Sequence, residues 1–495
     1  EPRQETLSAV CMPWRELDWS GAEAPGDAAA AWAALLAEDR VTGFDFGQAP
    51  LMRVALIRVG PDRWRWLWSH HHILLDGWCL PLVFRDVLGD YERRGGTVTA
   101  APRPIARPYR DYIDWLGRQD LGAAEAFWRR QLAGFAGAPE LRLPRPAVVA
   151  VAGEPGAAER VLSAGESDAL RLWARSHGLT LNTVFQGAWA VLLQRLGLGR
   201  DVAFGVTVAG RPAELAGVEE MIGLFINTLP LRVAVEPTAA VLPWLKALQQ
   251  AQAEARQFEH TPLAAIQGWS EVGRGQSLFE SILVFENYPG DDALRQVPSS
   301  LRFSGLQTRE QTNFPLTAAV VPAQRLTLRL AFDAGRFAAE AMERLLEQWR
   351  HLVLGLTAKT AARLADLDPV GAEERAALLA FGQAARLDYR PETILDVLER
   401  QVRRAPTAAA LLAPGRELSY AELWERAGHV ALELRGAGRA ARRCGGAVPR
   451  QEPGAGCGDG RRVAGGRFFP AGRSVVCAGA PSGAVGGCAP GVARR

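Results

Sequence analysis

The residues with the clearest chemical potential lie within one short stretch. His70, His71 and His72 are consecutive, and Asp76 and Gly77 follow within five residues of the last one. Imidazole has a pKa of about 6.5 and can therefore accept a proton at neutral pH. A carboxylate four residues beyond a histidine can meet it across a turn, and glycine lets the backbone turn where a side chain would clash. The pattern indicates a general base for the attack of an amine or alcohol on an acyl group.

Two other interpretations of these histidines remain open from the residues alone. A histidine cluster can bind a metal, but neighbouring residues on a strand point to opposite faces, and no third ligand follows at helical or hairpin spacing. We therefore expect no metal. A buried histidine with a satisfied hydrogen bond is also common, and His-x-x-x-Asp is a weak signal by itself. The pattern alone does not separate catalysis from a structural role.

The histidines are expected between a strand and a helix. Residues 63–68 alternate, with Trp64, Trp66 and Trp68 on one side, and this alternation predicts a strand whose tryptophan face is buried. Residues 80–93 have the spacing of an amphipathic helix. The histidines and the aspartate would then occupy the turn between these two elements.

The rest of the chain alternates between strand and helix patterns. We expect helices at 27–40, 125–132, 166–177, 183–196, 240–256 and 338–354, and strands at 51–59, 201–209, 229–235, 280–286, 316–321 and 326–332. This order is typical of an α/β or α+β region of about 370 residues, which is too large for one core and so favours two lobes. Residues 360–390 are expected to form a linker with one helix.

Composition and charge exclude several classes of protein. Of the 495 residues, 48% are hydrophobic and 22% charged, as in an ordinary globular chain. No run of 18 apolar residues occurs, so no membrane-spanning helix is predicted and a cytoplasmic protein is expected. The formal net charge is +3, but it is unevenly distributed, because residues 439–495 contain ten Arg and only two acidic residues. The remainder is mildly acidic, which argues against a nucleic-acid-binding body.

Residues 71–77 read His-His-Ile-Leu-Leu-Asp-Gly and resemble the HHxxxDG signature of the condensation domains of nonribosomal peptide synthetases. Further segments resemble the family's blocks and follow in its order. They are Tyr-Arg-Asp-Tyr-Ile-Asp-Trp at 109–115, Gly-Arg-Pro at 210–212, the run from Ile222 to Arg232, His-Thr-Pro-Leu at 260–263, and the segments at 278–281 and 285–289. The resemblance covers roughly residues 10–365.

The resemblance implies an α/β fold of the chloramphenicol-acetyltransferase type, with two lobes in a V. The HHxxxDG loop would lie in a tunnel between them, with a carrier protein docking at each mouth. An acceptor amine would attack a donor thioester there and form a peptide bond. His71 and His72 of the motif are implied in catalysis, with His72 as the catalytic residue. Asp76 would hold the loop through a charge partner, for which Arg211 is the candidate, and Gly77 would keep the approach open.

Several other residues have two expected roles. Trp78 would belong to the pocket wall or to the core. Asn227 and Thr228 are expected in a polar turn after an apolar strand, with lining of the tunnel as the alternative, and Arg211 is also a candidate for the tunnel. The block at 109–115 is expected to pack a helix against the lobe.

The resemblance also suggests a subtype and partners. Residues 76–81 read Asp-Gly-Trp-Cys-Leu-Pro, which resembles chain-elongating domains that accept an L-configured donor terminus, rather than cyclising or epimerising relatives. No cofactor is expected to bind directly, because the substrates would be carried on the phosphopantetheine of separate carrier domains. The expected partners are upstream and downstream peptidyl carrier proteins and an adjacent adenylation domain, without nucleic acid or membrane.

The expected domains are an N-terminal lobe at 1–150, a C-terminal lobe at 151–365, a linker at 366–390, and the start of an adenylation domain at 391–438. Two motifs that open the family's pattern are absent, so we expect a truncated N-terminal lobe. The alternative function is then an inactive remnant that at most docks carrier proteins. A stand-alone acyltransferase using coenzyme A is disfavoured, since residues 417–423 (Glu-Leu-Ser-Tyr-Ala-Glu-Leu) resemble an adenylation-domain block and place the chain on an assembly line.

Residues 439–495 are expected to be a low-complexity tail. Residues 441–495 contain no Leu, Ile, Lys, Tyr, Trp, Thr or Asn, yet the spacing of the adenylation family is kept. A frameshift near Gly438 would produce this, and we favour it over a basic tail that binds an acidic partner. Four of the six cysteines lie here, at Cys444, Cys457, Cys477 and Cys488. Since no Cys-x-x-Cys pair occurs, they do not indicate a zinc site.

Overall fold

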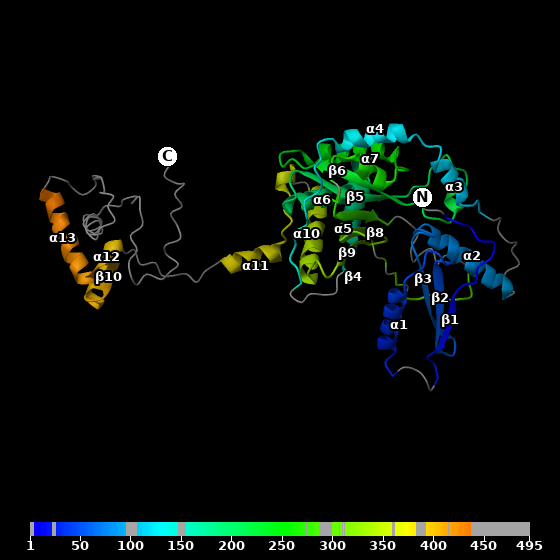
Figure 1. The fold of residues 1–495 in the computed structure, drawn as a ribbon, viewed down its shortest axis with the longest axis horizontal. Helices are drawn as coiled ribbons and strands as arrows, with labels where there is room; N and C mark the ends of the chain where they lie inside the picture. Colours follow the sequence, from blue (N-terminus) through cyan, green and yellow to red (C-terminus); the bar gives the residue numbers. More distant parts are fainter. Residues whose placement is uncertain are drawn as a thin grey trace. The chain divides into compact units, whose positions relative to one another are not determined.

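The computed structural model describes residues 4–21, 26–95, 106–146, 155–273, 275–286, 299–305, 307–308, 310, 312–358, 362–382, 393–413 and 415–436. The chain divides into two compact units, Glu1–Ala377 and Leu378–Arg495 (Figure 1). Helix α11 (Ala372–Gly382) crosses the division. The tail at 439–495, its four cysteines and the expected lobe boundary near residue 150 lie outside the described residues.

A three-stranded sheet carries the histidine motif at one end. Its order is β1 (Trp14–Asp18), β2 (Met52–Gly60) and β3 (Arg63–His70), with β1 parallel and β3 antiparallel to β2. Parallel strands need a crossover, and helix α1 (Ala28–Thr42) supplies it. The Asp27 side chain caps this helix by accepting hydrogen bonds from the amides of its first turn. Leu35 of the helix packs on Ala55 and Ile57 of β2.

Helix α2 (Cys79–Arg94) follows the motif and packs on β3 through Phe84 and Leu88. The ring of Phe84 meets Trp66 and Trp68 edge-on, at centroid distances of 5.4 and 5.7 Å. The expectation of a buried tryptophan face is wrong for two of its members, because Trp64 and Trp66 are 49% and 38% exposed. Alternation shows which side chains share a face, but it does not show whether another element covers that face.

The larger sheet has six strands in the order β4-β9-β8-β7-β5-β6. The pairs β5–β7 and β7–β8 are parallel, and the others are antiparallel. The bounds are β4 (Pro155–Val161), β5 (Asp201–Val208), β6 (Asn227–Ala234), β7 (Ser281–Phe285), β8 (Leu316–Pro322) and β9 (Leu326–Asp333). Most residues of β5 and β8 are buried, as expected for strands covered on both faces.

Helices enclose this sheet and form the main core with it (Figure 1). Helix α6 (Leu181–Arg195) is buried at every residue from 183 to 193, so it is an interior helix rather than an amphipathic one. Trp349 of α10 (Ala339–Thr357) packs edge-on against Trp189 of α6, at 5.1 Å between centroids. Other helices are α3 (Arg110–Leu116), α4 (Leu121–Leu132), α5 (Ala164–Ser176), α7 (Val241–Arg256), α8 (Leu263–Trp269), η1 (Val218–Glu220) and η2 (Leu364–Asp366).

The second unit contains a helix, a hairpin and a helix in its described part. They are α12 (Ile394–Arg404), β10 (Ala409–Ala413), β11 (Arg416–Ser419) and α13 (Tyr420–Gly436). The two strands are antiparallel, and Ala410, Leu418 and Ala427 are buried. Thr393 and Asp396 form a reciprocal capping box at the start of α12.

The strands and helices expected from periodicity are confirmed within a few residues of their ends. Strands β1, β4, β10 and β11 were not predicted. Strands β1 and β4 are mostly exposed, with no alternating apolar face, and β10 and β11 have only five and four residues. None of the helices among the described residues is long and apolar enough to cross a membrane.

Replacing Trp349 with alanine should lower the free energy of unfolding by about 3–5 kcal/mol, because its indole is fully buried between helices. Urea titration followed by far-UV circular dichroism would measure the change. Leu172→Ala on α5, where the side chain is 63% exposed, is the matched control and should change the value by less than about 0.5 kcal/mol. Equal losses in the two variants would contradict this assignment of the core.

Candidate active site

The motif forms a short, braced loop between β3 and α2. The amide of His71 donates to Leu51 O at 2.9 Å, so the loop begins with a hydrogen bond to the strand region next to it. Within the loop, Leu74 N donates to His71 O and Cys79 N donates to Asp76 O, at 3.1 and 2.9 Å. Because β3 and α2 also pack on each other, both ends of the loop are fixed.

The ring of His71 is held by its own loop. Its Nδ1 accepts a hydrogen bond from the amide of Ile73 at 3.1 Å, which requires a lone pair on that nitrogen. The ring also meets Phe46 and Phe44 edge-on, at centroid distances of 4.8 and 6.4 Å. In this geometry His71 carries its proton on Nε2 when neutral and supports the loop.

The other two histidines lie in contrasting environments. His72 is exposed, and no described residue forms a hydrogen bond to its imidazole. His70 lies beside Trp68, with 4.8 Å between ring centroids, and its Nδ1 is buried without a partner among the described residues. Burial, reinforced by the charges of His72 and His71, lowers the pKa of His70 to about 4. Of the three, only His72 combines an accessible ring with uncommitted nitrogens.

Asp76 is the buried anchor of the loop. Its Oδ2 accepts hydrogen bonds from the amides of Phe225 and Ile226 at 3.0 and 3.3 Å. Its Oδ1 accepts from Nη2 of Arg211 at 3.4 Å, and the two side chains are 0% and 8% exposed. The predicted pairing of Asp76 with Arg211 is confirmed. It joins the motif loop to the segment before β6, 135 residues away.

Arg211 is committed to this anchor rather than presented to an open surface. Its Nη1 donates to the carbonyls of Val218 and, at 3.0 Å, Met221. Its guanidinium lies over the ring of Phe225, 4.0 Å from the centroid. The structure therefore places Arg211 beside the loop as a support, and gives it no exposed contact of the kind expected for a tunnel wall.

Cys79 belongs to the same junction, although the sequence analysis did not select it. Its Sγ lies 3.3 Å from Asp76 Oδ1 and 3.2 Å from the carbonyl oxygen of Gly223, and it also contacts Arg211. Burial raises the pKa of the thiol above its usual range, with the Asp76 charge adding to the effect. Its position three residues after Asp76, directly before the helix predicted at 80–93, was the signal that could have found it.

Two glycines allow the segment at 210–226 to approach the loop closely. Gly210 has φ of +62°, and a Cβ there would lie 1.8 Å from the carbonyl oxygen of Phe225. A Cβ on Gly223 would lie 2.0 Å from the ring of Tyr109. The Tyr109 hydroxyl donates to Leu224 O at 2.5 Å, and burial raises its pKa to about 12. The block at 109–115 was expected to pack a helix against the lobe, and it contributes α3, whose Tyr112 packs with Phe225 of this segment.

Gly77 and Trp78 form the turn that leads into α2. The carbonyl of Gly77 accepts a hydrogen bond from Leu80 N at 3.4 Å. Trp78 occupies the N-cap position and is 36% exposed, so it is not a core residue. Its indole therefore lies at the surface beside the motif.

The expectation of a polar turn at Asn227 and Thr228 is wrong, because both residues begin strand β6. The apolar residues 222–226 before them are not a strand, since the amides of Phe225 and Ile226 serve Asp76 instead of a neighbouring strand. The amide group of Asn227 donates to the carbonyls of Glu259 and Thr261 at 2.9 and 2.6 Å. It ties β6 to the connection between α7 and α8.

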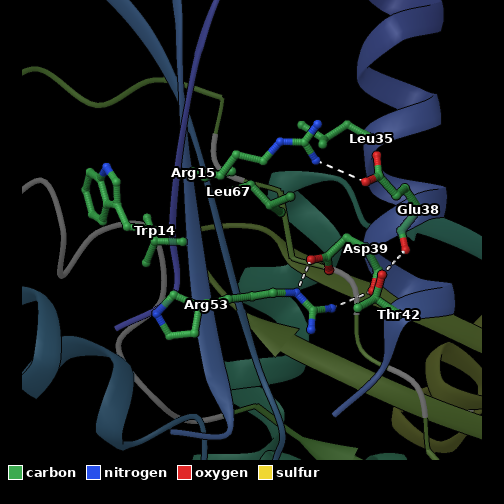
Figure 2. Close-up of a pocket in the computed structure, with 11 residues that line it drawn as sticks. Trp14, Arg15, Leu35, Glu38, Asp39, Thr42, Arg53 and Leu67 are labelled. Carbon is green, nitrogen blue, oxygen red and sulfur yellow. Dashed lines mark hydrogen bonds and ion pairs between the residues drawn. The ribbon is translucent and has the colours of Figure 1, made fainter. Parts of the chain in front are cut away.

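A cavity of about 230 Å³ lies away from the motif, between α1 and the three-stranded sheet (Figure 2). Arg53 donates to Asp39 at 2.5 Å, and Arg15 pairs with Glu38 at 3.0 Å, so the charged groups at its wall neutralise one another. No motif residue lines it. The cavity is therefore distinct from the candidate active site.

Comparison with known proteins gives the class of the protein. The Condensation domain family matches residues 1–379, and the chain therefore belongs to that family. It has the mixed α/β, two-lobed acyltransferase fold of those domains. One subunit of the linear gramicidin synthase of Brevibacillus parabrevis is 42% identical to this chain over 402 residues. These residues are 81% of this chain and 5% of that subunit.

Further relatives agree with this class. Another polypeptide of the same linear gramicidin synthase is 43% identical over 401 residues, covering 80% of this chain and 8% of the relative. A crystal structure of a four-domain nonribosomal peptide synthetase bound to AMP and glycine superposes with a TM-score of 0.67 at 18% identity. That superposition covers 87% of this chain and 33% of the other. The chain thus spans a small part of the relatives that it matches.

Removing the guanidinium of Arg211 should be strongly destabilising, because it leaves the buried Asp76 carboxylate without its charge partner. We expect Arg211→Ala to lower the free energy of unfolding by about 3–5 kcal/mol. Arg110→Ala removes an arginine that is 85% exposed, and it should cost under about 1 kcal/mol. The double variant Asp76→Asn with Arg211→Ala should lose less than the sum of its single changes, and strict additivity would argue against the pair.

His70 should make stability depend on pH. Because burial lowers its folded-state pKa to about 4, from an ordinary value of about 6.5, the unfolded chain binds the proton more readily between these values. Stability is then retained above the unfolded pKa and lost as pH falls below it. After allowance for partial exposure, we expect a loss of about 1 kcal/mol between pH 7 and pH 5 that His70→Phe removes. Urea titrations at both pH values would test this, and an unchanged loss in the variant would refute it.

Proposed function

We propose that this chain carries a condensation domain that forms a peptide bond between two thioester-bound substrates. The donor is an aminoacyl or peptidyl thioester on an upstream carrier, and the acceptor is an aminoacyl thioester on a downstream carrier. The observation that carries the proposal is the exposed imidazole of His72, held on a loop whose Asp76 is locked into a buried junction. Family membership supplies the class of reaction.

The proposed reaction needs only the two thioester-bound substrates and the imidazole of His72. The acceptor α-amine attacks the donor carbonyl carbon, so a carbon–nitrogen bond forms as the carbon–sulfur bond breaks. His72 accepts the proton lost by the amine and returns it to the departing sulfur. A general base of this kind contributes about 10²–10⁴-fold. Holding two tethered substrates together can contribute more, through effective molarity. His72 could also act by orienting the amine, and the pH profile of the reaction separates the two roles.

Replacement of His72 with alanine should lower the condensation rate by about 10²–10⁴-fold, because the proton acceptor is lost. The assay supplies donor and acceptor aminoacyl thioesters on carrier domains and detects the dipeptidyl carrier by mass spectrometry. The free energy of unfolding should change by less than about 0.5 kcal/mol, since the side chain is exposed. His177→Ala, outside the motif, is the matched control.

Two outcomes would contradict this assignment. Full activity in the His72→Ala chain would remove His72 from catalysis. Carrier binding without turnover in the unaltered chain would instead support a domain that only docks carrier proteins. A reaction rate that decreases as the solution is acidified in the unaltered chain, and that loses this pH dependence in the variant, supports proton transfer over orientation.

The proposal also covers the subtype of the domain, the identity of the second unit and the carrier of the substrates. The run Asp-Gly-Trp-Cys-Leu-Pro at 76–81 supports an elongation-type domain with an L-configured donor. The helix, hairpin and helix of the second unit are compatible with the opening of an adenylation domain at 391–438. Phosphopantetheine belongs to the carriers in this proposal, and the reaction takes place in the cytoplasm. Donors that differ only in the configuration of the terminal residue, offered in one assay, would test the subtype.

A further inference from the structure

Helix α2 ends in a buried carboxylate that takes no part in the proposed chemistry. Glu92, in its last turns, is only 3% exposed. Its Oε1 accepts hydrogen bonds from Ser299 Oγ at 2.8 Å, from Ser300 N at 2.6 Å and from Ser300 Oγ at 2.8 Å. A buried carboxylate is costly unless donors of this kind compensate it. The three hydrogen bonds therefore form a specific attachment.

The donors come from a distant part of the chain. Ser299 and Ser300 lie in the connection between β7 and β8, two strands of the six-stranded sheet, and are more than 200 residues from Glu92. We call residues 299–305 the strap. The Oγ of Ser299 also accepts a hydrogen bond from Leu301 N at 3.1 Å, so the start of the strap has a defined local structure.

The same helix is attached near its other end. Asp76 and Cys79 contact Arg211 and Gly223, as described above, and midway Arg85 pairs with Glu220 at 2.7 Å. From Cys79 to Glu92 the helix rises about 20 Å at 1.5 Å per residue. The packing of Phe84 and Leu88 on β3 and the Arg85–Glu220 pair hold the first half of the helix, and the Glu92 attachment adds a constraint at its far end. The loop that carries His72 is continuous with this helix.

We propose that Glu92 is a positioning residue. By anchoring the strap to the end of α2, it fixes the direction of the helix and so the placement of the His72 loop against the segment at 210–226. The anchor is independent of the proposed function, and only its consequence for turnover rests on that function.

Hydrogen–deuterium exchange of the full chain tests the anchor directly. In Glu92→Ala, exchange in the strap and in the motif loop at 71–78 should accelerate by about tenfold or more, since the attachment is lost. Ser300→Ala should accelerate it less, because the backbone donor remains. Glu92→Gln, which keeps a side-chain oxygen as acceptor, should restore part of the protection.

Two matched controls separate the anchor from general effects. Asp86→Ala removes a carboxylate on the same helix whose side chain is 56% exposed, and Ser304→Ala removes an exposed serine of the strap. Neither should change exchange in the strap or the loop. Turnover supplies a second measurement: kcat should fall about tenfold in Glu92→Ala, with KM unchanged and partial recovery in Glu92→Gln.

The outcomes are distinct. Unchanged exchange of the strap in Glu92→Ala overturns the anchor. Faster exchange of the strap without any change at 71–78 overturns the positioning role. A fall in kcat that only parallels the fraction of folded protein, measured by circular dichroism, also overturns it. If the unaltered chain shows no turnover, the proposed function fails, while the exchange of the loop still decides the role of Glu92.

Discussion

A buried carboxylate is costly unless hydrogen-bond donors compensate it, and the groups around the Asp76 side chain are arranged to supply such donors. The donors come from the amides of Phe225 and Ile226, the guanidinium of Arg211 and the thiol of Cys79. To supply them, the segment before β6 must leave strand geometry and run against the loop, which explains the tight approaches at Gly210 and Gly223. The local conformation of two segments far apart in sequence thus follows from one negative charge.

The three adjacent histidines of the motif region lie in three different environments. His70, at the end of β3, lies against the ring of Trp68, where burial lowers its pKa and keeps it neutral. The turn gives His71 an amide partner. His72, one residue further, is exposed. Unlike a triad in which a carboxylate orients the base, Asp76 here holds the loop and forms no hydrogen bond to the His72 imidazole, so its contribution is to place His72.

Periodicity was enough to predict most strands and helices and the position of the candidate loop, whereas the Asp76–Arg211 pair was suggested by the family resemblance. They failed where the outcome depends on what lies elsewhere in the fold. Trp64 and Trp66 alternate as a buried face would, but nothing in their own strand determines whether another element covers them. Residues 222–226 are apolar enough for a strand, but their amides serve a distant aspartate. Glu92 looked like any charged helix residue, because its partners lie more than 200 residues away.

The junction between the motif loop and the segment at 218–226 is built largely on main-chain atoms. Arg211 binds carbonyl oxygens, Asp76 binds amides, and Tyr109 binds the carbonyl of Leu224. Such contacts do not depend on which side chains the segment carries. Ile222, which is 38% exposed, can therefore vary without disturbing the junction. The exposed positions of this segment are in this sense free to diversify in evolution, while the main-chain contacts that hold it stay the same.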